Sequence, residues 1–109
     1  YYENLKDWAD ENDIQLPILI ENCNHPYHMF YLITPTLEYR NKFIKHLKNN
    51  GIEAVFHYLP LHLSEMGKKF GGKKGDCPIT ENISDRIVRL PFFNNLKIED
   101  LNFDYFYDF

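Results

Sequence analysis

The sequence predicts an α/β (α+β) fold in which helices cover a small sheet, and three observations support this class. The chain has 109 residues, a length that suits one domain. Hydrophobic residues make up 44% of it, which is enough to form a core. Runs rich in aromatic and β-branched residues alternate with segments whose apolar residues recur at helical spacing. Helices between strands indicate a small sheet covered by helices.

The first half of the chain holds the clearest helix signals. An apolar stripe predicts a helix from the start of the chain to about Asn12, formed by Tyr1, Leu5, Trp8 and Ala9. A second stripe predicts a helix that Thr36 caps and Gly51 ends, formed by Tyr39, Phe43, Ile44 and Leu47. We expect Arg40 and the lysines of this second helix to stay in water.

Strands are predicted on either side of that second helix. Residues 28–34 (HMFYLIT) form a continuous apolar run whose length fits a strand buried on both faces, and Pro35 ends it. Residues 13–26 form the connection that leads to this strand, with a short extended stretch inside it. Residues 52–58 (IEAVFHY) alternate well enough for a second strand, which Pro60 ends.

The last part of the chain is predicted to be more irregular. Residues 64–70 suit a short helix, and residues 71–78 form a loop rich in lysine and glycine. Thr80 can cap a helix that runs to about Val88, after which residues 89–91 form a short extended piece. A last helix is indicated by Ile98, Leu101 and Tyr105.

Charge and hydropathy exclude several classes of partner. The formal net charge is −4 and the pI is near 5.7, whereas nucleic-acid domains are usually basic on one face. We therefore expect no nucleic-acid partner. No apolar run is long enough to cross a membrane, and the start lacks the pattern of a signal peptide, so we expect a cytoplasmic protein. The chain begins at Tyr1 rather than Met, which suggests a fragment, with processing as the alternative explanation.

The candidate binding site lies in residues 51–62 (GIEAVFHYLPLH). The second predicted strand delivers His57 and Tyr58, Pro60 turns the chain, and His62 follows. Two imidazoles and a phenol at a strand end are well placed to face a ligand. The alternative is a structural role, in which Tyr58 packs, His57 forms a local hydrogen bond and His62 lies on the surface.

Other groupings leave alternatives open. Arg86 and Arg89 either stabilise a helix end or form a guanidinium fork for a carboxylate or phosphate. Residues 67–74 nearly fit a phosphate-binding loop, but Lys74 stands where a hydroxyl is needed, so we interpret them as a surface loop. A small zinc protein is a weaker hypothesis. The ligand types that zinc needs are present, but their spacing in the sequence does not match a compact zinc finger; the residues are Cys23, His25, His28, His57 and His62.

Several segments together resemble the DegT/DnrJ/StrS family of aminotransferases. The similarity extends over about residues 1–101, and it includes the run from His28 to Arg40 and Gly51-Ile52. The phrase HYLPLH, followed by SDRIVRLPFF, is its most specific part. The similarity covers nearly the whole chain and points to the branch that acts on a nucleotide-linked 4-keto-6-deoxy sugar. In the tail, residues 102–109 (NFDYFYDF) are more aromatic than the regular closing helix that we expect for the family.

The resemblance implies a function for the parent protein and a place for this chain within it. It implies that residues 1–109 are the C-terminal small domain of a type I aminotransferase that uses pyridoxal phosphate (PLP). A lysine in a large domain, absent here, holds the cofactor, so this chain contains no catalytic residue and is expected to be inactive alone. Glutamate donates the amino group, the acceptor is a sugar such as dTDP-4-keto-6-deoxyglucose, and the enzyme is a homodimer that serves deoxysugar or polysaccharide biosynthesis.

The matching positions also suggest roles for individual residues. His57, Tyr58 and His62 are expected to line the nucleotide-sugar side of the cleft, and Arg86 and Arg89 are candidates for contact with an anion. No metal or cofactor ligand is expected in this chain. A free-standing interaction module without catalytic activity is the alternative function, with exposed aromatic side chains as its contact surface.

Overall fold

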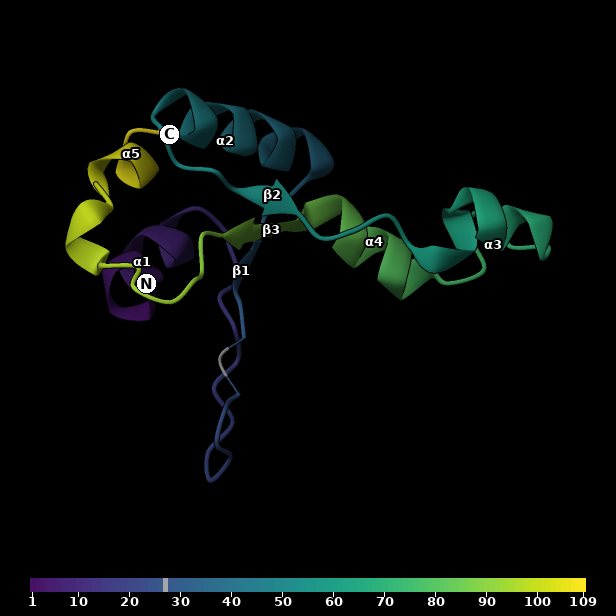
Figure 1. Cartoon of the computed structure of the whole chain (residues 1–109), viewed down its shortest axis with the longest axis horizontal. Helices are drawn as coiled ribbons and strands as arrows, with labels where there is room; N and C mark the ends of the chain where they lie inside the picture. The colour runs from purple at the N-terminus through teal and green to yellow at the C-terminus, as the bar shows by residue number, and fades with distance from the viewer. Residues whose placement is uncertain (27) are drawn as a thin grey trace.

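The computed structural model describes residues 1–26 and 28–109, and it confirms the predicted fold class. Figure 1 shows a three-stranded antiparallel sheet with helices packed around it. The elements, in chain order, are α1 (Tyr2–Glu11), β1 (Phe30–Ile33), α2 (Leu37–Asn49), β2 (Val55–Phe56), the 3-10 turn η1 (Leu61–Leu63), α3 (Glu65–Lys69), α4 (Pro78–Arg86), β3 (Ile87–Leu90), the 3-10 turn η2 (Ile98–Asp100) and α5 (Asp104–Tyr107).

The sheet has the order β1-β3-β2, so the last strand in sequence lies in the middle. Tyr31 of β1 and Val55 of β2 both pair with Arg89 of β3. This register places Arg89 opposite Val55, two residues before His57, and Val88 opposite the end of β2 at Phe56. The central position of β3 therefore joins two parts of the site that lie more than thirty residues apart in sequence.

Both predicted strands are shorter in the structure than the apolar runs suggested. The first spans four residues and the second only two, Val55 and Phe56. The prediction that the first strand is buried on both faces is wrong, because Leu32 is fully buried while its strand neighbours are only half-buried. An antiparallel sheet often leaves one face more open to solvent.

The structure confirms the two long helices and their ends. The Thr36 hydroxyl accepts a hydrogen bond from the backbone N–H of Tyr39 at 3.1 Å, which caps the start of α2. Gly51 has a φ of 78°, in the left-handed region that glycine adopts without steric cost, and it follows the end of α2. The first predicted helix corresponds to α1, and α3 matches the short predicted helix at residues 64–70.

The predicted bounds of the next helix are wrong at both ends. It begins at Pro78 rather than after Thr80, because proline suits the first helical turn, where its missing N–H costs nothing. It ends at Arg86 rather than near Val88, because Ile87–Leu90 pairs with β1 and β2 as the central strand. Extended pairing therefore replaces the last predicted helical turn.

The core lies between the sheet, α1, α2 and the tail. Its buried apolar side chains include Leu5, Trp8, Leu32, Phe43, Leu47, Val88, Leu90 and Phe106. The aromatic tail forms the short helix α5, and its Phe106 ring lies 6.0 Å from the Trp8 ring and 5.9 Å from the Phe43 ring. Aromatic rings at such distances pack favourably edge to face. The tail thus closes the core, although by one helical turn rather than a long helix.

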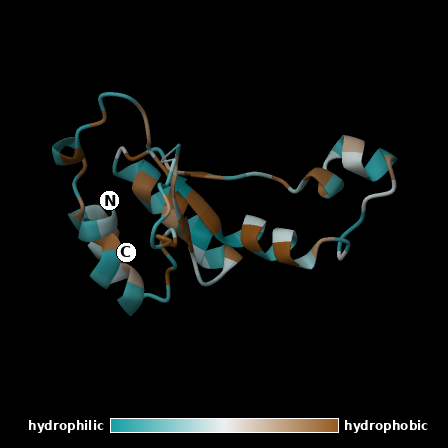
Figure 2. Ribbon diagram, turned by 90° about the horizontal axis from the view of Figure 1, so that it is seen from below, coloured by the Kyte–Doolittle hydropathy of each residue, from teal (hydrophilic) through white to brown (hydrophobic). Residues whose placement is uncertain are grey.

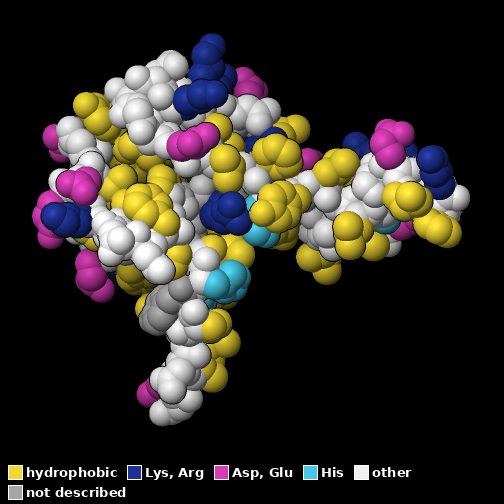
Figure 3. Space-filling view, in the orientation of Figure 1, with side chains coloured by type: hydrophobic (Ala, Val, Ile, Leu, Met, Phe, Trp, Pro, Cys, Tyr) yellow, Lys and Arg dark blue, Asp and Glu magenta, His cyan; other side chains and the backbone are white. Residues whose placement is uncertain are grey.

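The segment from Leu59 to Arg86 extends away from this core, and we call it the arm. In Figure 1, α3 and α4 reach outward from the body that holds α1, α2 and α5. Pro60 is the only residue of the arm that is buried, and several large apolar side chains are exposed there. Figure 2 shows hydrophobic residues along the ribbon of the arm, and Figure 3 shows hydrophobic side chains on its surface. The arm has little core of its own.

The described part of the chain contains neither a helix suited to span a membrane nor a cluster of metal ligands. None of its helices combines the length and the apolar character that crossing a bilayer requires. Within the same residues, no group of three or more histidine, cysteine, aspartate or glutamate side chains is arranged to hold a metal ion.

Candidate functional site

The structure brings three of the five predicted site residues together, and we call this group the Arg89 corner: His57, Tyr58 and Arg89. The Arg89 Nη1 atom donates to His57 Nδ1 at 3.2 Å and to the Tyr58 hydroxyl oxygen at 3.3 Å. The imidazole and phenol rings stack with their centroids 4.0 Å apart. The Arg89 guanidinium carbon also lies 5.8 Å from the centre of the phenol ring.

The corner carries positive charge and is open to solvent. Burial lowers the pKa of His57, and the nearby positive charges of Arg89 and His28 lower that pKa further. A neutral imidazole fits the observed contact, because Nδ1 must accept a hydrogen bond from the guanidinium N–H. The Tyr58 side chain is 59% exposed, so the corner is not sealed inside the domain.

No carboxylate of the described residues forms an ion pair with Arg89. The ion pairs found there join Lys42 to Glu38 and His62 to Glu81. The guanidinium is therefore held by two neutral side chains and keeps its charge available. Such a group can form paired, charge-assisted hydrogen bonds to a phosphate or carboxylate.

His62 lies apart from the corner. Its Nε2 atom is 2.8 Å from Glu81 Oε1, and the two side chains are only 16% and 12% exposed. The hydrogen bond from His62 lowers the pKa of the Glu81 carboxyl, and bonds from the backbone N–H groups of Gly75 and Cys77 act in the same direction. The imidazole thus contacts the arm itself.

Arg86 also lies outside the corner, at the end of α4. Its Nη2 and Nε atoms donate to the side-chain and backbone oxygens of Asn82 at 2.6 and 3.4 Å, and Nη1 donates to the Thr34 carbonyl at 3.5 Å. The bond to Thr34 ties α4 to the chain that follows β1. The two arginines, which the sequence could not distinguish, have different surroundings.

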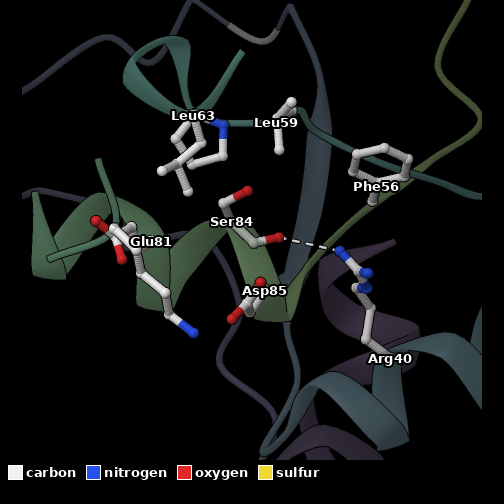
Figure 4. A pocket seen from close by; sticks show the side chains of 9 residues that line it. Arg40, Phe56, Leu59, Leu63, Glu81, Ser84 and Asp85 are labelled. Carbon is white, nitrogen blue, oxygen red and sulfur yellow. Dashed lines mark hydrogen bonds between the residues drawn. The ribbon is translucent and has the colours of Figure 1, made fainter. Parts of the chain in front are cut away.

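A pocket of about 240 Å³ lies beside the corner, between β2, η1 and α4. Figure 4 shows the side chains that line it, which belong to Arg40, Phe56, Leu59, Pro60, Leu63, Lys74, Glu81, Ser84 and Asp85. The Ser84 hydroxyl donates to the Tyr58 carbonyl at 2.5 Å. The pocket is thus connected to the corner through the backbone of Tyr58.

Sequence reasoning missed Arg40, which was expected to stay in water. It is half-buried, its Nη1 atom donates to the Ser84 carbonyl at 3.0 Å, and its guanidinium carbon lies 5.1 Å from the Phe56 ring centre. Burial lowers its pKa, against the opposing charge of Asp85. The sequence gives no signal for this role, because the contact between α2 and α4 spans more than forty residues.

The described residues do not provide a site for PLP. Every lysine of the chain is exposed, whereas a lysine that forms a Schiff base is usually desolvated or placed beside another cation. Lys74 and Arg40 line the pocket, but Glu81 and Asp85 line it too, so the charged side chains of the lining balance. Residues 67–69 belong to α3, so the surface-loop interpretation holds only for residues 70–74, and among the described residues no strand leads into this segment as it does in a phosphate-binding loop.

Comparison with known proteins gives a consistent family. Residues 1–103 match the model of the DegT/DnrJ/EryC1/StrS aminotransferase family. An uncharacterized protein of Methanocaldococcus jannaschii is 33% identical over 89 residues, which are 78% of this chain and 23% of that protein. The dTDP-3-amino-3,4,6-trideoxy-alpha-D-glucose transaminase of Micromonospora megalomicea subsp. nigra is 26% identical over 98 residues, which are 88% of this chain and 25% of the enzyme.

Solved structures have the same fold. DesV of S. venezuelae, determined in complex with a ketimine intermediate, superposes with a TM-score of 0.76 at 28% sequence identity. The match covers 89% of this chain and 26% of DesV. The chain therefore spans about a quarter of the length of the proteins it matches.

Proposed function

We propose that this chain, which belongs to the DegT/DnrJ/EryC1/StrS aminotransferase family, acts as the C-terminal small domain of a PLP-dependent sugar aminotransferase and closes its substrate cleft. The remainder of the enzyme holds the cofactor, because no lysine of this chain lies in an enclosed site. Bound there, PLP carries the amino group between the two substrates. We propose that the complete enzyme is a cytoplasmic homodimer.

The observation that carries this proposal is the open, positively charged Arg89 corner. A nucleotide-linked sugar presents a diphosphate, and a guanidinium without an acidic partner is suited to bind it. His57 keeps its neutral form beside Arg89 and so holds the guanidinium without neutralising it. Tyr58 contributes an exposed phenol that can stack on a ring of the ligand or donate a hydrogen bond to it.

We propose glutamate as the amino donor and a nucleotide-linked 4-keto-6-deoxy sugar as the acceptor, as in dTDP-4-amino-4,6-dideoxygalactose transaminase. The substrate class rests on the family and on the resemblance of the segments around the corner. The part of this chain is to bind and orient the acceptor and to exclude water when the cleft closes. It supplies no nucleophile and no proton shuttle.

A trapping experiment tests the division of roles. The 109-residue chain is incubated with PLP and borohydride, and glutamate-dependent amination of the keto sugar is measured in parallel. We expect no stoichiometric lysine adduct and no amination from the chain alone, and both from the complete enzyme. A site-specific adduct together with amination by the chain alone would overturn the proposal.

A second candidate is a free-standing interaction module, and the exposed apolar side chains of the arm favour it. Leu61 is 87% exposed, Phe70 86% and Ile79 80%, all on a segment with little core. The coding sequence separates the two functions. A reading frame that encodes only this stretch behind its own start codon supports the module, and one that continues into a lysine-bearing domain supports the enzyme.

A further inference from the structure

We propose that α4 positions the corner of the candidate site by holding both ends of residues 58–62, with Ser84 at one end and Glu81 at the other. That these residues form a wall of a substrate cleft rests on the proposed function, whereas the holding is a property of the fold alone. Ser84 and Glu81 are three positions apart, so they share one face of the helix. Both line the pocket of about 240 Å³ shown in Figure 4.

Ser84 holds the first end through the backbone. Its hydroxyl donates to the carbonyl of Tyr58 at 2.5 Å, which fixes the peptide group next to the exposed phenol. Ser84 is held in turn, because its own carbonyl accepts a hydrogen bond from Arg40 Nη1 at 3.0 Å. The contact therefore runs from α2 through α4 to the corner, and Arg40 supports it without touching Tyr58.

Glu81 holds the second end through the His62 side chain. One carboxylate oxygen, Oε1, is 2.8 Å from His62 Nε2, 2.8 Å from the backbone nitrogen of Gly75 and 3.4 Å from that of Cys77. A carboxylate that accepts several hydrogen bonds at once fixes the groups that donate them. Glu81 thus ties the turn η1 and residues 75–77 to the first turns of α4.

The backbone around His62 is packed closely enough to require glycine at two positions. A Cβ atom on Gly67 would lie 2.0 Å from the Leu61 carbonyl oxygen, and one on Gly72 would lie 2.4 Å from the His62 carbonyl oxygen. Real Cβ atoms do not approach backbone so closely, so these glycines let α3 and its loop pack against η1. The backbone of His62 is therefore packed against α3 and its loop.

This arrangement gives His62 a positioning role instead of a direct contact with the sugar nucleotide. Its imidazole is largely buried and already hydrogen-bonded, while Tyr58 of the corner is exposed. The other charged groups that line the pocket are Arg40, Lys74 and Asp85. Asp85 also lies on α4, but it forms no hydrogen bond with residues 58–62 in the described part of the chain, so it serves as a control.

Amide hydrogen exchange on the 109-residue chain tests the proposal by NMR. We expect Glu81→Ala to speed the exchange of the Gly75 amide about tenfold, and Glu81→Gln, which keeps one acceptor oxygen, to have a smaller effect. We expect Ser84→Ala to shift and broaden the backbone signals of Tyr58 and its neighbours, and Ser84→Thr to restore them. Asp85→Ala is the matched control, and exchange at core amides reports whether each variant is folded.

A pH titration adds a readout that a general loss of packing does not give. The Gly75 and Cys77 amide shifts are expected to follow the ionisation of Glu81, whose pKa the His62 hydrogen bond lowers, and this step is expected to vanish in Glu81→Gln. The proposal is overturned if Glu81→Ala and Ser84→Ala leave residues 58–62 and 75–77 unchanged, or if Asp85→Ala has the same effects. These measurements need no ligand, so their outcome is separate from that of the transamination assay.

Discussion

Removal of the Phe106 side chain tests whether the aromatic tail completes the core. The ring is fully buried and lies 6.0 Å from Trp8, 5.9 Å from Phe43 and 5.6 Å from Phe103. Truncating a buried phenylalanine to alanine costs about 3–5 kcal/mol, from lost burial and from the cavity left behind. The three ring contacts place Phe106→Ala in the upper half of that range, since each aromatic pair adds about 0.5–1.5 kcal/mol. A domain of this size has a total stability of about 5–15 kcal/mol, so the loss is large.

Urea unfolding measures this loss, with Trp8 as the reporter because it is the only tryptophan. With a denaturant slope of about 2 kcal/mol/M, a loss of about 4 kcal/mol lowers the midpoint by about 2 M. Phe70→Ala is the matched control, because that ring is 86% exposed and its loss should change stability by less than about 0.5 kcal/mol. Equal shifts in both variants, followed also by circular dichroism, would refute the packing of α5 on Trp8.

Three further predictions follow from single contacts. Thr34→Val should lower the free energy of unfolding by about 1 kcal/mol, because the buried hydroxyl donates to the Arg86 carbonyl at 2.9 Å; an unchanged urea midpoint would contradict this. Gly72→Ala should increase trypsin cleavage in the loop of residues 71–78 while the core stays folded, because the new methyl group collides with the His62 carbonyl. Unchanged cleavage would show that the loop accommodates the methyl group. Burial raises the pKa of the Tyr1 phenol to about 12. The stability that this phenol contributes below pH 10.0 should therefore be lost as the pH rises to about 12. A phenolate absorbance titration without such a late step would contradict this.

Local patterns predicted most of the fold. The stripes of the first two long helices, the Thr36 cap and the stop at Gly51 all depend on neighbouring residues, and all are found. The strand lengths and the end of α4 depend on pairing between distant segments. From local sequence alone, the start of Ile87–Leu90 is predicted as the last turn of a helix. In the structure this segment is a strand, because it pairs with β1 and β2.

The candidate site was predicted only in part, because some of its contacts are local in sequence and others join distant segments. A proline after a strand end identified the segment that carries His57 and Tyr58. Arg89 joins them through side-chain hydrogen bonds between paired strands, whereas Arg86 bonds within α4 and to Thr34, and sequence spacing cannot distinguish these surroundings. The partner of His62 is nineteen residues away on α4, and no local pattern pointed to Glu81.

The roles proposed for Arg89 and its corner are tested most directly by steady-state kinetics on the complete aminotransferase. Arg89→Ala should raise the KM for the nucleotide sugar at least about tenfold, because a charge-assisted contact to phosphate is lost, and leave the KM for glutamate unchanged. Arg86→Ala, which removes a guanidinium engaged by Asn82, is the matched control. A KM for the nucleotide sugar that Arg89→Ala leaves unchanged, or that Arg86→Ala raises equally, would contradict the account.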